Sequence, residues 1–168
     1  MNPCMSLVLR FLALPTLGAS GCSAFSDEKD KVVGTWKLVS GVSQEVATGQ
    51  ITNIYKGTPV GFISFGPEGR FSVIVVDSNR KKPLGAIPTA SEAEALYRSM
   101  SAYAGTYTIK GDQVINHPDA SWNETWTGTD QARHYKLDGD RLSLMTDQSP
   151  DLFSGKMSVR TLVWEKIK

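Results

Sequence analysis

The chain has 168 residues, 40% of them hydrophobic and 21% charged, and its formal net charge is +1. This length suits one domain with a substantial core, and the composition excludes a disordered chain, a strongly basic nucleic-acid-binding surface and a membrane-spanning helix. Two cysteines are too few for a disulfide-stapled fold or a thiolate zinc site.

The first 21 residues have the features of an export signal. Arg10 is the only charged residue among residues 1–24, and the short apolar run Phe11–Leu17 is followed by small residues. The segment Ala19–Cys22 resembles the bacterial lipobox, whose cysteine is acylated and becomes the mature N-terminus, although the motif usually has leucine where Ala19 stands. We therefore expect a lipoprotein-type signal over residues 1–21, a lipid anchor on Cys22 and a charged linker over residues 22–31.

Alternative readings of this segment stay open. The ordinary signal peptidase could cut after Ala19 or Ala24 and release a soluble exported protein, or the chain could start in the cytosol. Cys4 lies inside the signal, so the mature body from residue 23 has no cysteine and Cys22 has no disulfide partner. This absence favours acylation, and Ser23 beside the cysteine implies the outer membrane in a Gram-negative cell.

From Val32 onward, hydrophobic residues recur with the period of two that is typical of β-strands. Three pairs of short strands are joined by tight turns, and the Asp-Gly pair at 138–139 is among the strongest hairpin signals. The predicted strands are Val33–Ser40, Gly61–Phe65, Arg70–Val76, Thr106–Lys110, Gln113–His117, Arg133–Leu137, Asp140–Leu144 and Val159–Glu165, with a short strand at Ile51–Tyr55.

One segment has helical spacing instead. Ser91 and Glu94 have the spacing of a capping box, and apolar residues follow at intervals of three and four. This pattern predicts one short amphipathic helix that begins at Ser91 and ends near Gly105, after a proline-containing loop over residues 77–90. Its apolar face consists of Ala93, Leu96, Tyr97, Met100 and Tyr103.

Short antiparallel strands must hide their edges, and a closed sheet hides them completely. A barrel of eight strands has an interior that side chains fill or that holds one small ligand. A two-sheet sandwich is the alternative, but Greek-key crossings need longer connections than these tight hairpins. We therefore predict an all-β protein, a closed up-and-down barrel of about eight antiparallel strands over residues 32–168.

The ordered motifs of the body resemble those of the bacterial and fungal lipocalin-like domain family, of the calycin type. Gly34-Thr-Trp36 is similar to the G-x-W motif that opens the first lipocalin strand. The resemblance implies a barrel with an internal cavity, and the family has no agreed biochemical activity. The matching stretches are Val33–Ser40, Gly66–Val73, Tyr103–Tyr107, Trp126–Gln131 with Arg133, Leu137–Leu142 and Leu162–Glu165.

The resemblance also implies how the barrel closes. The tryptophan of the G-x-W motif packs beneath a basic side chain from the last strand in lipocalins, so Gly34 and Trp36 are expected at the closed end. Arg160 and Lys166 are the two candidates for the basic partner. A cation over an indole face contributes roughly 0.5–2 kcal/mol.

Alternation in the strand from Arg133 places Arg133, Tyr135 and Leu137 on one face and His134 on the other. Leu137 indicates the inner face, so Arg133 is expected inside the barrel, where its guanidinium needs an acceptor. Protein carboxylates such as Asp130 or Asp119, tyrosine hydroxyls, carbonyl groups or a ligand carboxylate could supply it.

Periodicity leaves the orientation of His117 undecided, whereas the family resemblance favours an inward histidine there. Aromatic residues could line a pocket around Arg133, and Trp122 and Trp126 are expected on a loop at its mouth. The predicted ligand-binding residues are Arg133, His117, Tyr135, Trp126, Tyr107 and Tyr103.

These observations predict an exported protein that binds a small hydrophobic or amphipathic molecule. The expected partners are that ligand and, through the lipid anchor alone, a membrane. The sequence favours a binding protein over an enzyme, with no cofactor and no metal site. One alternative is an isomerase or cyclase that uses His117 as general base beside Arg133. Another is an envelope interaction or inhibitor module with a filled barrel.

Overall fold

The structure, a computed structural model, describes residues 31–55, 57–151 and 154–168. The expected signal peptide, Cys22 and all but the last residue of the expected linker lie outside these residues. The strands are β1 (Gly34–Glu45), β2 (Ile51–Asn53), β3 (Val60–Phe65), β4 (Arg70–Val76), β5 (Met100–Lys110), β6 (Gln113–Ser121), β7 (Gln131–Asp138), β8 (Arg141–Met145), β9 (Ser149–Pro150) and β10 (Met157–Lys166). The helices are α2 (Ala90–Arg98) and the single 3-10 turn η1 (Glu124–Trp126).

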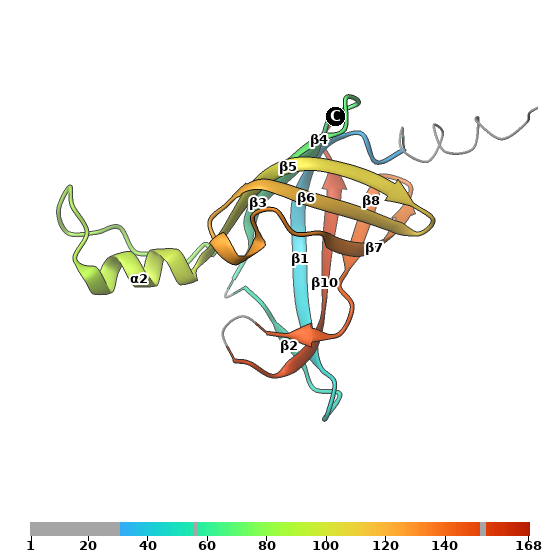
Figure 1. Ribbon diagram of the computed structural model, residues 1–168. Coiled ribbons are helices and arrows are strands. Elements are labelled where there is room, and N and C mark those ends of the chain that lie inside the picture. The colour runs from blue at the N-terminus through green and yellow to red at the C-terminus, as the bar shows by residue number, and fades with distance from the viewer. Residues whose placement is uncertain (1–30, 56, 152–153) are drawn as a thin grey trace, which may run out of the picture.

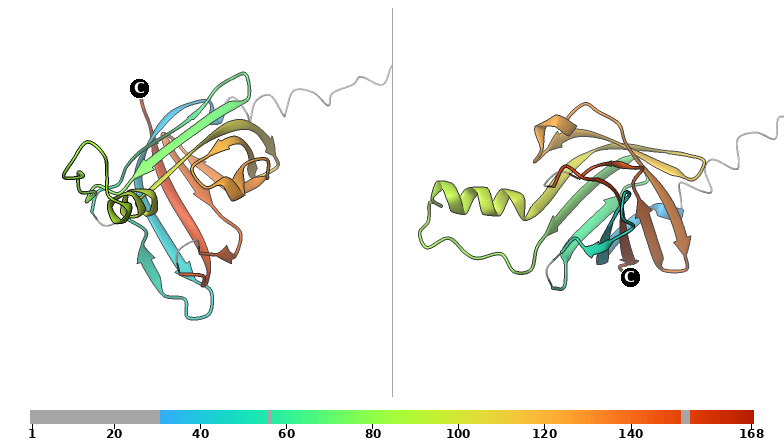
Figure 2. Two further views of the ribbon diagram at one scale, coloured as in Figure 1. Left: turned by 60° about the vertical axis from the view of Figure 1, so that its left-hand side comes forward. Right: turned by 90° about the horizontal axis from the view of Figure 1, so that it is seen from below.

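The sheet closes on itself. Neighbouring strands follow the order β1-β3-β4-β5-β6-β7-β8-β10, every pair is antiparallel, and β10 also pairs with β1 (Figure 1). The short strands β2 and β9 pair with the outer parts of β1 and β10 and extend one end of the barrel. The prediction of a closed barrel of eight strands is confirmed, and the additional views in Figure 2 show its curved wall.

The core follows the predicted alternation. Trp36 and Leu38 of β1 face inward, as do Phe71, Val73 and Val75 of β4, and all five are buried. Phe71–Val76 pairs with Val60–Phe65 of β3 on one side, and Arg70–Val76 pairs with Met100–Thr106 of β5 on the other. The buried side chains therefore form one continuous core inside the barrel.

The closed end has the arrangement that the G-x-W motif implied. The Trp36 indole donates from Nε1 to the Val32 carbonyl oxygen at 2.9 Å, and the Lys166 ammonium lies 5.0 Å from the centre of the Trp36 ring. Gly34 has φ +132°, a backbone conformation that would be strained with any other side chain, and this favours glycine there. Lys166 is therefore the basic partner of Trp36, and the assignment of Arg160 to barrel closure was wrong.

The helix α2 differs from the prediction at both ends. Thr89, not Ser91, is its N-cap, and the Glu92 carboxylate accepts hydrogen bonds from the Thr89 backbone while Glu94 pairs with Arg98. The helix stops at Arg98 because the next residues pair with β4 and become β5. Gly105 lies within that strand, at a bulge where a Cβ would collide with the His117 carbonyl oxygen.

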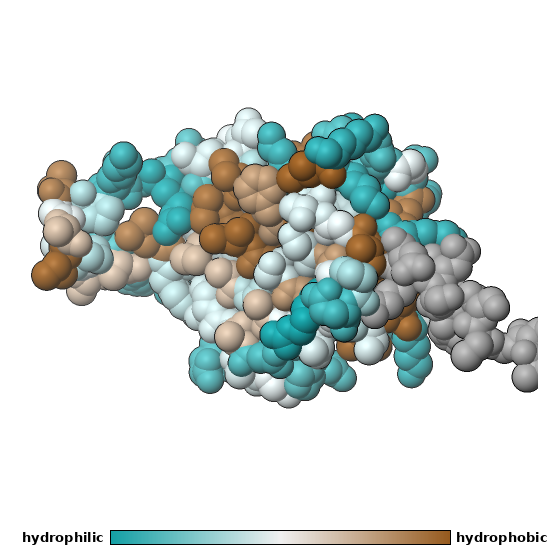
Figure 3. Space-filling view, turned by 90° about the horizontal axis from the view of Figure 1, so that it is seen from above, coloured by the Kyte–Doolittle hydropathy of each residue, from teal (hydrophilic) through white to brown (hydrophobic). Residues whose placement is uncertain are grey.

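The helix α2 and the loop before it form an arm that extends sideways from the barrel (Figure 1). No residue of α2 is buried, and Leu84 and Ile87 in the loop are 100% and 86% exposed. Seen from above, hydrophobic side chains gather at the tip of this arm (Figure 3). Among the described residues, no helix combines the length and the apolar character needed to cross a bilayer.

Candidate functional site

A cavity of about 480 Å³ occupies the barrel and extends to the end where β1 finishes and β10 begins. Ligand-binding cavities in proteins are roughly 300–1,000 Å³, so the volume suits one small molecule. The deeper wall is apolar, whereas charged residues from β1, α2 and the segment before β10 surround the mouth. The deep apolar residues are Ile63, Val73, Val75, Leu144, Leu162 and Trp164, and the charged residues near the mouth are Glu45, Asp77, Arg98, Asp151, Lys156 and Arg160.

The register between β6 and β7 places Arg133 in this cavity. Arg133 pairs with Val114, and Asn116 pairs with Gln131. Because directly paired residues share a face, the buried Val114 places the Arg133 side chain inside the barrel. The expectation of an inward Arg133 is met, and its side chain lines the cavity.

The guanidinium of Arg133 is held without a carboxylate. It donates from Nη1 to the Ala132 carbonyl oxygen at 2.6 Å and from Nη2 to Gln131 Oε1 at 3.4 Å, and it lies 5.8 Å from the centre of the Trp126 ring. A guanidinium has five N–H donors, so these two hydrogen bonds leave further donors available.

The two carboxylates considered as partners for Arg133 are engaged on the outer face. Asp130 pairs with His117 at 2.9 Å, and Asp119 pairs with Arg70. The acceptors used by Arg133 are one carbonyl and one side-chain amide oxygen, both neutral. Bracing of Arg133 by a protein carboxylate therefore does not occur within the described residues.

Three aromatic rings form one wall of the site, as the sequence predicted for the loop near the mouth. The Trp126 ring meets the Tyr103 and Trp122 rings edge-on, with centroids 5.3 Å and 5.0 Å apart. Tyr103 and Trp126 line the cavity, whereas Trp122 contacts both rings without lining it. The turn η1 positions Trp126, since the Asn123 side chain caps it at the Thr125 backbone N–H.

Tyr55 and Arg160 belong to the site but were not predicted there. Arg160 lines the cavity and forms an ion pair with Asp151. Burial, reinforced by the neighbouring Tyr103 and opposed by Arg160, raises the pKa of Tyr55 to about 12. Burial also raises the pKa of Tyr103, opposed by the charge of Arg133. Both phenols are therefore protonated at neutral pH and can donate hydrogen bonds.

Three of the predicted ligand-binding residues lie elsewhere. His117 points to the outer face, because its neighbours Asn116 and Pro118 occupy the inner one, and its side chain is about half exposed. The buried Tyr107 donates its hydroxyl to the Gly66 carbonyl oxygen at 2.9 Å near the closed end. Tyr135 packs against the core but does not line the cavity. The expectation of an inward His117 was therefore wrong, and so were the cavity positions of the two tyrosines.

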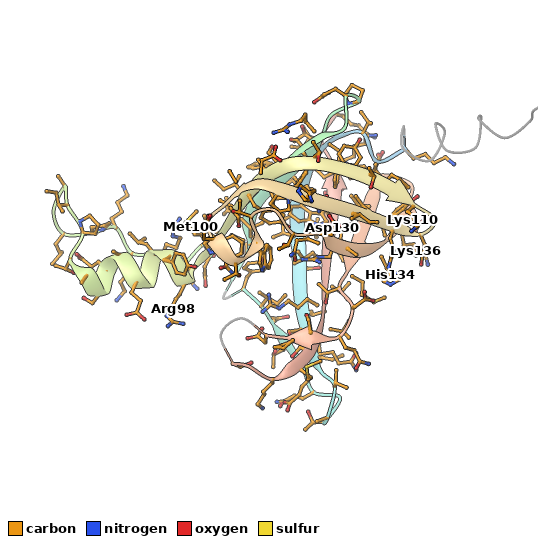
Figure 4. The ribbon with its side chains drawn as sticks, in the orientation of Figure 1. Arg98, Met100, Lys110, Asp130, His134 and Lys136 are labelled. Atoms are coloured by element: carbon orange, nitrogen blue, oxygen red, sulfur yellow. The ribbon has the colours of Figure 1, made fainter. Side chains whose placement is uncertain are left out.

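His134 is on the outer face, as alternation predicted. It lies near Lys136 and Lys110 at one edge of the barrel (Figure 4). Its Nδ1 pairs with Asp112 at 2.8 Å and its Nε2 with Asp147 at 3.1 Å, and hydrogen bonds to these carboxylates, that of Asp112 first, raise the His134 pKa. These contacts connect β7 to the segments beside it and leave His134 outside the cavity.

The inner wall of the cavity contains two polar atoms that have no hydrogen-bond partner within the described part of the chain. They are Asn116 Oδ1 and Trp164 Nε1, on residues that are each 1% exposed. A buried polar atom without a hydrogen-bond partner lowers the free energy of unfolding, so these two atoms are expected to destabilise the fold.

The two residues of the enzyme alternative lie apart. His117 and Arg133 face opposite sides of the wall formed by β6 and β7, so the geometry does not bring together the base and the cation of the enzyme alternative. Among the described residues, no three His, Cys, Asp or Glu side chains are grouped as metal ligands would be.

A family model described as a lipocalin-like domain matches residues 33–167. The chain is also similar to the solved structure of a lipocalin-like protein from Bacteroides uniformis, with 15% identity, a TM-score of 0.43, and coverage of 81% of this chain and 98% of that one. An uncharacterized protein from Bacteroides eggerthii has 15% identity and a TM-score of 0.40, with coverage of 81% and 99%. The comparison with curated proteins found no match.

Proposed function

The chain belongs to the lipocalin-like domain family, and from that premise we propose that its barrel binds a small hydrophobic or amphipathic molecule. The observation that supports this proposal is the cavity of about 480 Å³. Its deep apolar wall removes hydrocarbon or aromatic surface from water, at roughly 25 cal/mol for each Å² buried. Arg133, Tyr103 and Trp126 supply the polar and flat contacts that orient a ligand in such a cavity.

The proposal is tested by a small molecule that the protein retains when the full chain is purified from its own host. Native mass spectrometry should detect a noncovalent adduct on the wild-type protein. In Ser101→Trp, an indole added at the cavity wall should expel that adduct. Ala102→Trp is the matched control, because Ala102 pairs with the exposed Ile74 and faces outward.

An adduct on both the wild type and Ala102→Trp, and none on Ser101→Trp, is the expected result. A wild-type protein without an adduct would contradict the proposal, as would an adduct that survives in Ser101→Trp. Circular dichroism and thermal unfolding of the two variants check that each still forms the barrel.

We further propose that the protein is exported and anchored in the cell envelope by lipid on Cys22. The support is the sequence: one basic residue, a short apolar run and small residues precede a cysteine that has no partner in the mature body. One acyl chain gives marginal membrane binding, whereas two or more hold stably. The barrel and its cavity would then lie in the cell envelope, and the protein would bind its ligand there.

A further inference from the structure

The cations that line the cavity are paired with carboxylates, with one exception. Arg160 pairs with Asp151, Lys156 with Glu45 at 2.9 Å, and Arg98 with Glu94 at 2.9 Å. No carboxylate of the described residues lies within ion-pair distance of Arg133, whose protein acceptors are neutral. Of the cations that line the cavity, Arg133 is therefore the one whose charge the described residues leave uncompensated.

The groups beside Arg133 are hydrogen-bond donors. Tyr55, Tyr103, Arg133 and Arg160 all line the cavity. The Trp126 ring lies beside both Tyr103, with centroids 5.3 Å apart, and the Arg133 guanidinium, 5.8 Å from its centre. Neither tyrosine hydroxyl has a hydrogen-bond partner among the described residues. A ligand that contacts these donors must therefore bring acceptors.

The surroundings of these donors are apolar. The Trp126 ring lies against the guanidinium, and Ile63, Val73 and Leu144 line the deeper part of the cavity. A guanidinium on an aromatic face still presents the edge that binds a carboxylate through two parallel hydrogen bonds. A single uncompensated positive charge matches a single negative charge on the ligand.

From these observations, and resting on the proposed binding function, we infer that the ligand is an organic monocarboxylic acid. Its carboxylate binds the Arg133 guanidinium with the Tyr103 hydroxyl beside it, and its hydrocarbon or aromatic part fills the apolar end. Asp77, whose carboxylate accepts from the Asn79 backbone N–H, stands at the mouth and disfavours a second negative charge on the ligand there.

Isothermal titration calorimetry of the full chain with two matched probe sets tests this inference. Each set keeps one apolar group and varies its polar end from an acid to a neutral alcohol to a quaternary ammonium cation. The first set is decanoate, decanol and decyltrimethylammonium. The second set has a naphthalene ring in place of the decyl chain and starts from naphthoate. At least one acid should bind about tenfold or more tightly than its alcohol, and the cations should bind weakest. Raised salt should weaken the acids more than the alcohols.

Variants of Arg133 test whether this residue causes the preference for acids. Arg133→Gln should weaken acid binding by about tenfold to hundredfold while the alcohols change little, since a hydrogen bond to a charged group is lost. Arg133→Lys should keep the preference for acids. Arg70→Gln is the matched control, because that arginine pairs with Asp119 on the outer face and should leave all affinities unchanged.

Several results would overturn the inference while leaving the proposed function standing. These are an alcohol or a cation that binds as tightly as its acid, and an Arg133→Gln protein with undiminished acid affinity and intact thermal unfolding. A failure of both acids to bind would also overturn it, provided native mass spectrometry still finds a host molecule in the cavity. If that molecule is absent as well, the proposed function fails too.

Discussion

The ammonium group of Lys166 lies 5.0 Å from the centre of the Trp36 ring, across the closed end of the barrel. Trp36 opens β1 and Lys166 ends β10, and the two residues are paired in the register that joins these strands. The contact therefore lies at the seam where the sheet closes, and it covers a buried indole whose N–H is already bonded to Val32.

Lys166→Met should lower the free energy of unfolding by about 0.5–2 kcal/mol, because it keeps the aliphatic stem but removes the cation from the indole face. Urea denaturation measures the change. Lys136→Met is the matched control, since Lys136 is exposed on β7, and it should leave the midpoint nearly unchanged. Equal midpoints for all three proteins would show that the cation–π contact contributes nothing.

His134 gives the outer face a pH-dependent contribution to stability. Hydrogen bonds to Asp112 and then Asp147 raise its pKa above the ordinary value of 6.5, and the pKa of Asp112 is lowered below 3.8, mainly by its hydrogen bond to His134. Protonated His134 therefore stabilises the fold below about pH 6.5, and this stabilisation is lost as pH rises through the raised pKa. At the acid end, it is lost as pH falls through the lowered pKa of Asp112.

His134→Gln should consequently be less stable than the wild type at about pH 5.5 and equally stable at about pH 9, as urea midpoints at both pH values will test. The double variant Asp112→Asn, Asp147→Asn should remove the difference, because both acceptors of the imidazolium charge are gone. A deficit of the same size at both pH values would refute the electrostatic explanation.

The arm depends on the capping box of α2. Thr89→Ala removes the side chain that accepts from the Glu92 backbone N–H, and it should lower the local stability of the helix by about 1 kcal/mol. Hydrogen exchange of the α2 amides measures this effect, because the arm can open without unfolding the barrel. Ser91→Ala, at the cap that the sequence predicted, should leave exchange unchanged; faster exchange in that variant would favour the sequence prediction.

The buried polar side chains of the inner wall are expected to lower the free energy of unfolding. Asn116→Leu replaces a buried side chain whose Oδ1 has no partner in the described residues, so it should raise the free energy of unfolding by about 1–3 kcal/mol. Thermal and urea unfolding of ligand-free protein test this prediction. A destabilised variant would mean that the Asn116 amide has a partner in solution, such as an ordered water.

Cys22→Ser should move the protein from the membrane fraction to the soluble fraction of its host, because the serine cannot carry a thioether-linked lipid. Labelling with an alkyne fatty acid measures the acylation, and fractionation measures the membrane attachment. Cys4→Ser is the control, since Cys4 lies inside the predicted signal, and it should still be labelled and membrane-bound. A Cys22→Ser protein that remains in the membrane would refute the anchor.

Much of the fold could be predicted from local patterns in the sequence. The period of two and the tight turns at 66–69, 111–112 and 138–139 predicted the three hairpins correctly. The start of β5 was wrong, because Met100 and Tyr103 were predicted on the helix and lie in the strand. The inward Arg133 was also readable, because Leu137 on the same strand indicated the inner face. The helix start was not, because the spacing of a capping box fits Thr89 with Glu92 as well as Ser91 with Glu94, and only the reciprocal hydrogen bonds between Thr89 and Glu92 identify the cap.

Other features of the site were decided by contacts between distant parts of the chain. Alternation alone did not decide whether Asn116 or His117 faces the barrel interior. The pairing of Val114 with Arg133 places Val114, and therefore Asn116 two residues later, on the inner face. Tyr55 and Arg160 meet only because the barrel closes between β1 and β10. The sequence alone thus determined which segments form strands, since strand period and turn chemistry are local. The tertiary structure decided which side chains share the cavity, since that depends on register across the whole sheet.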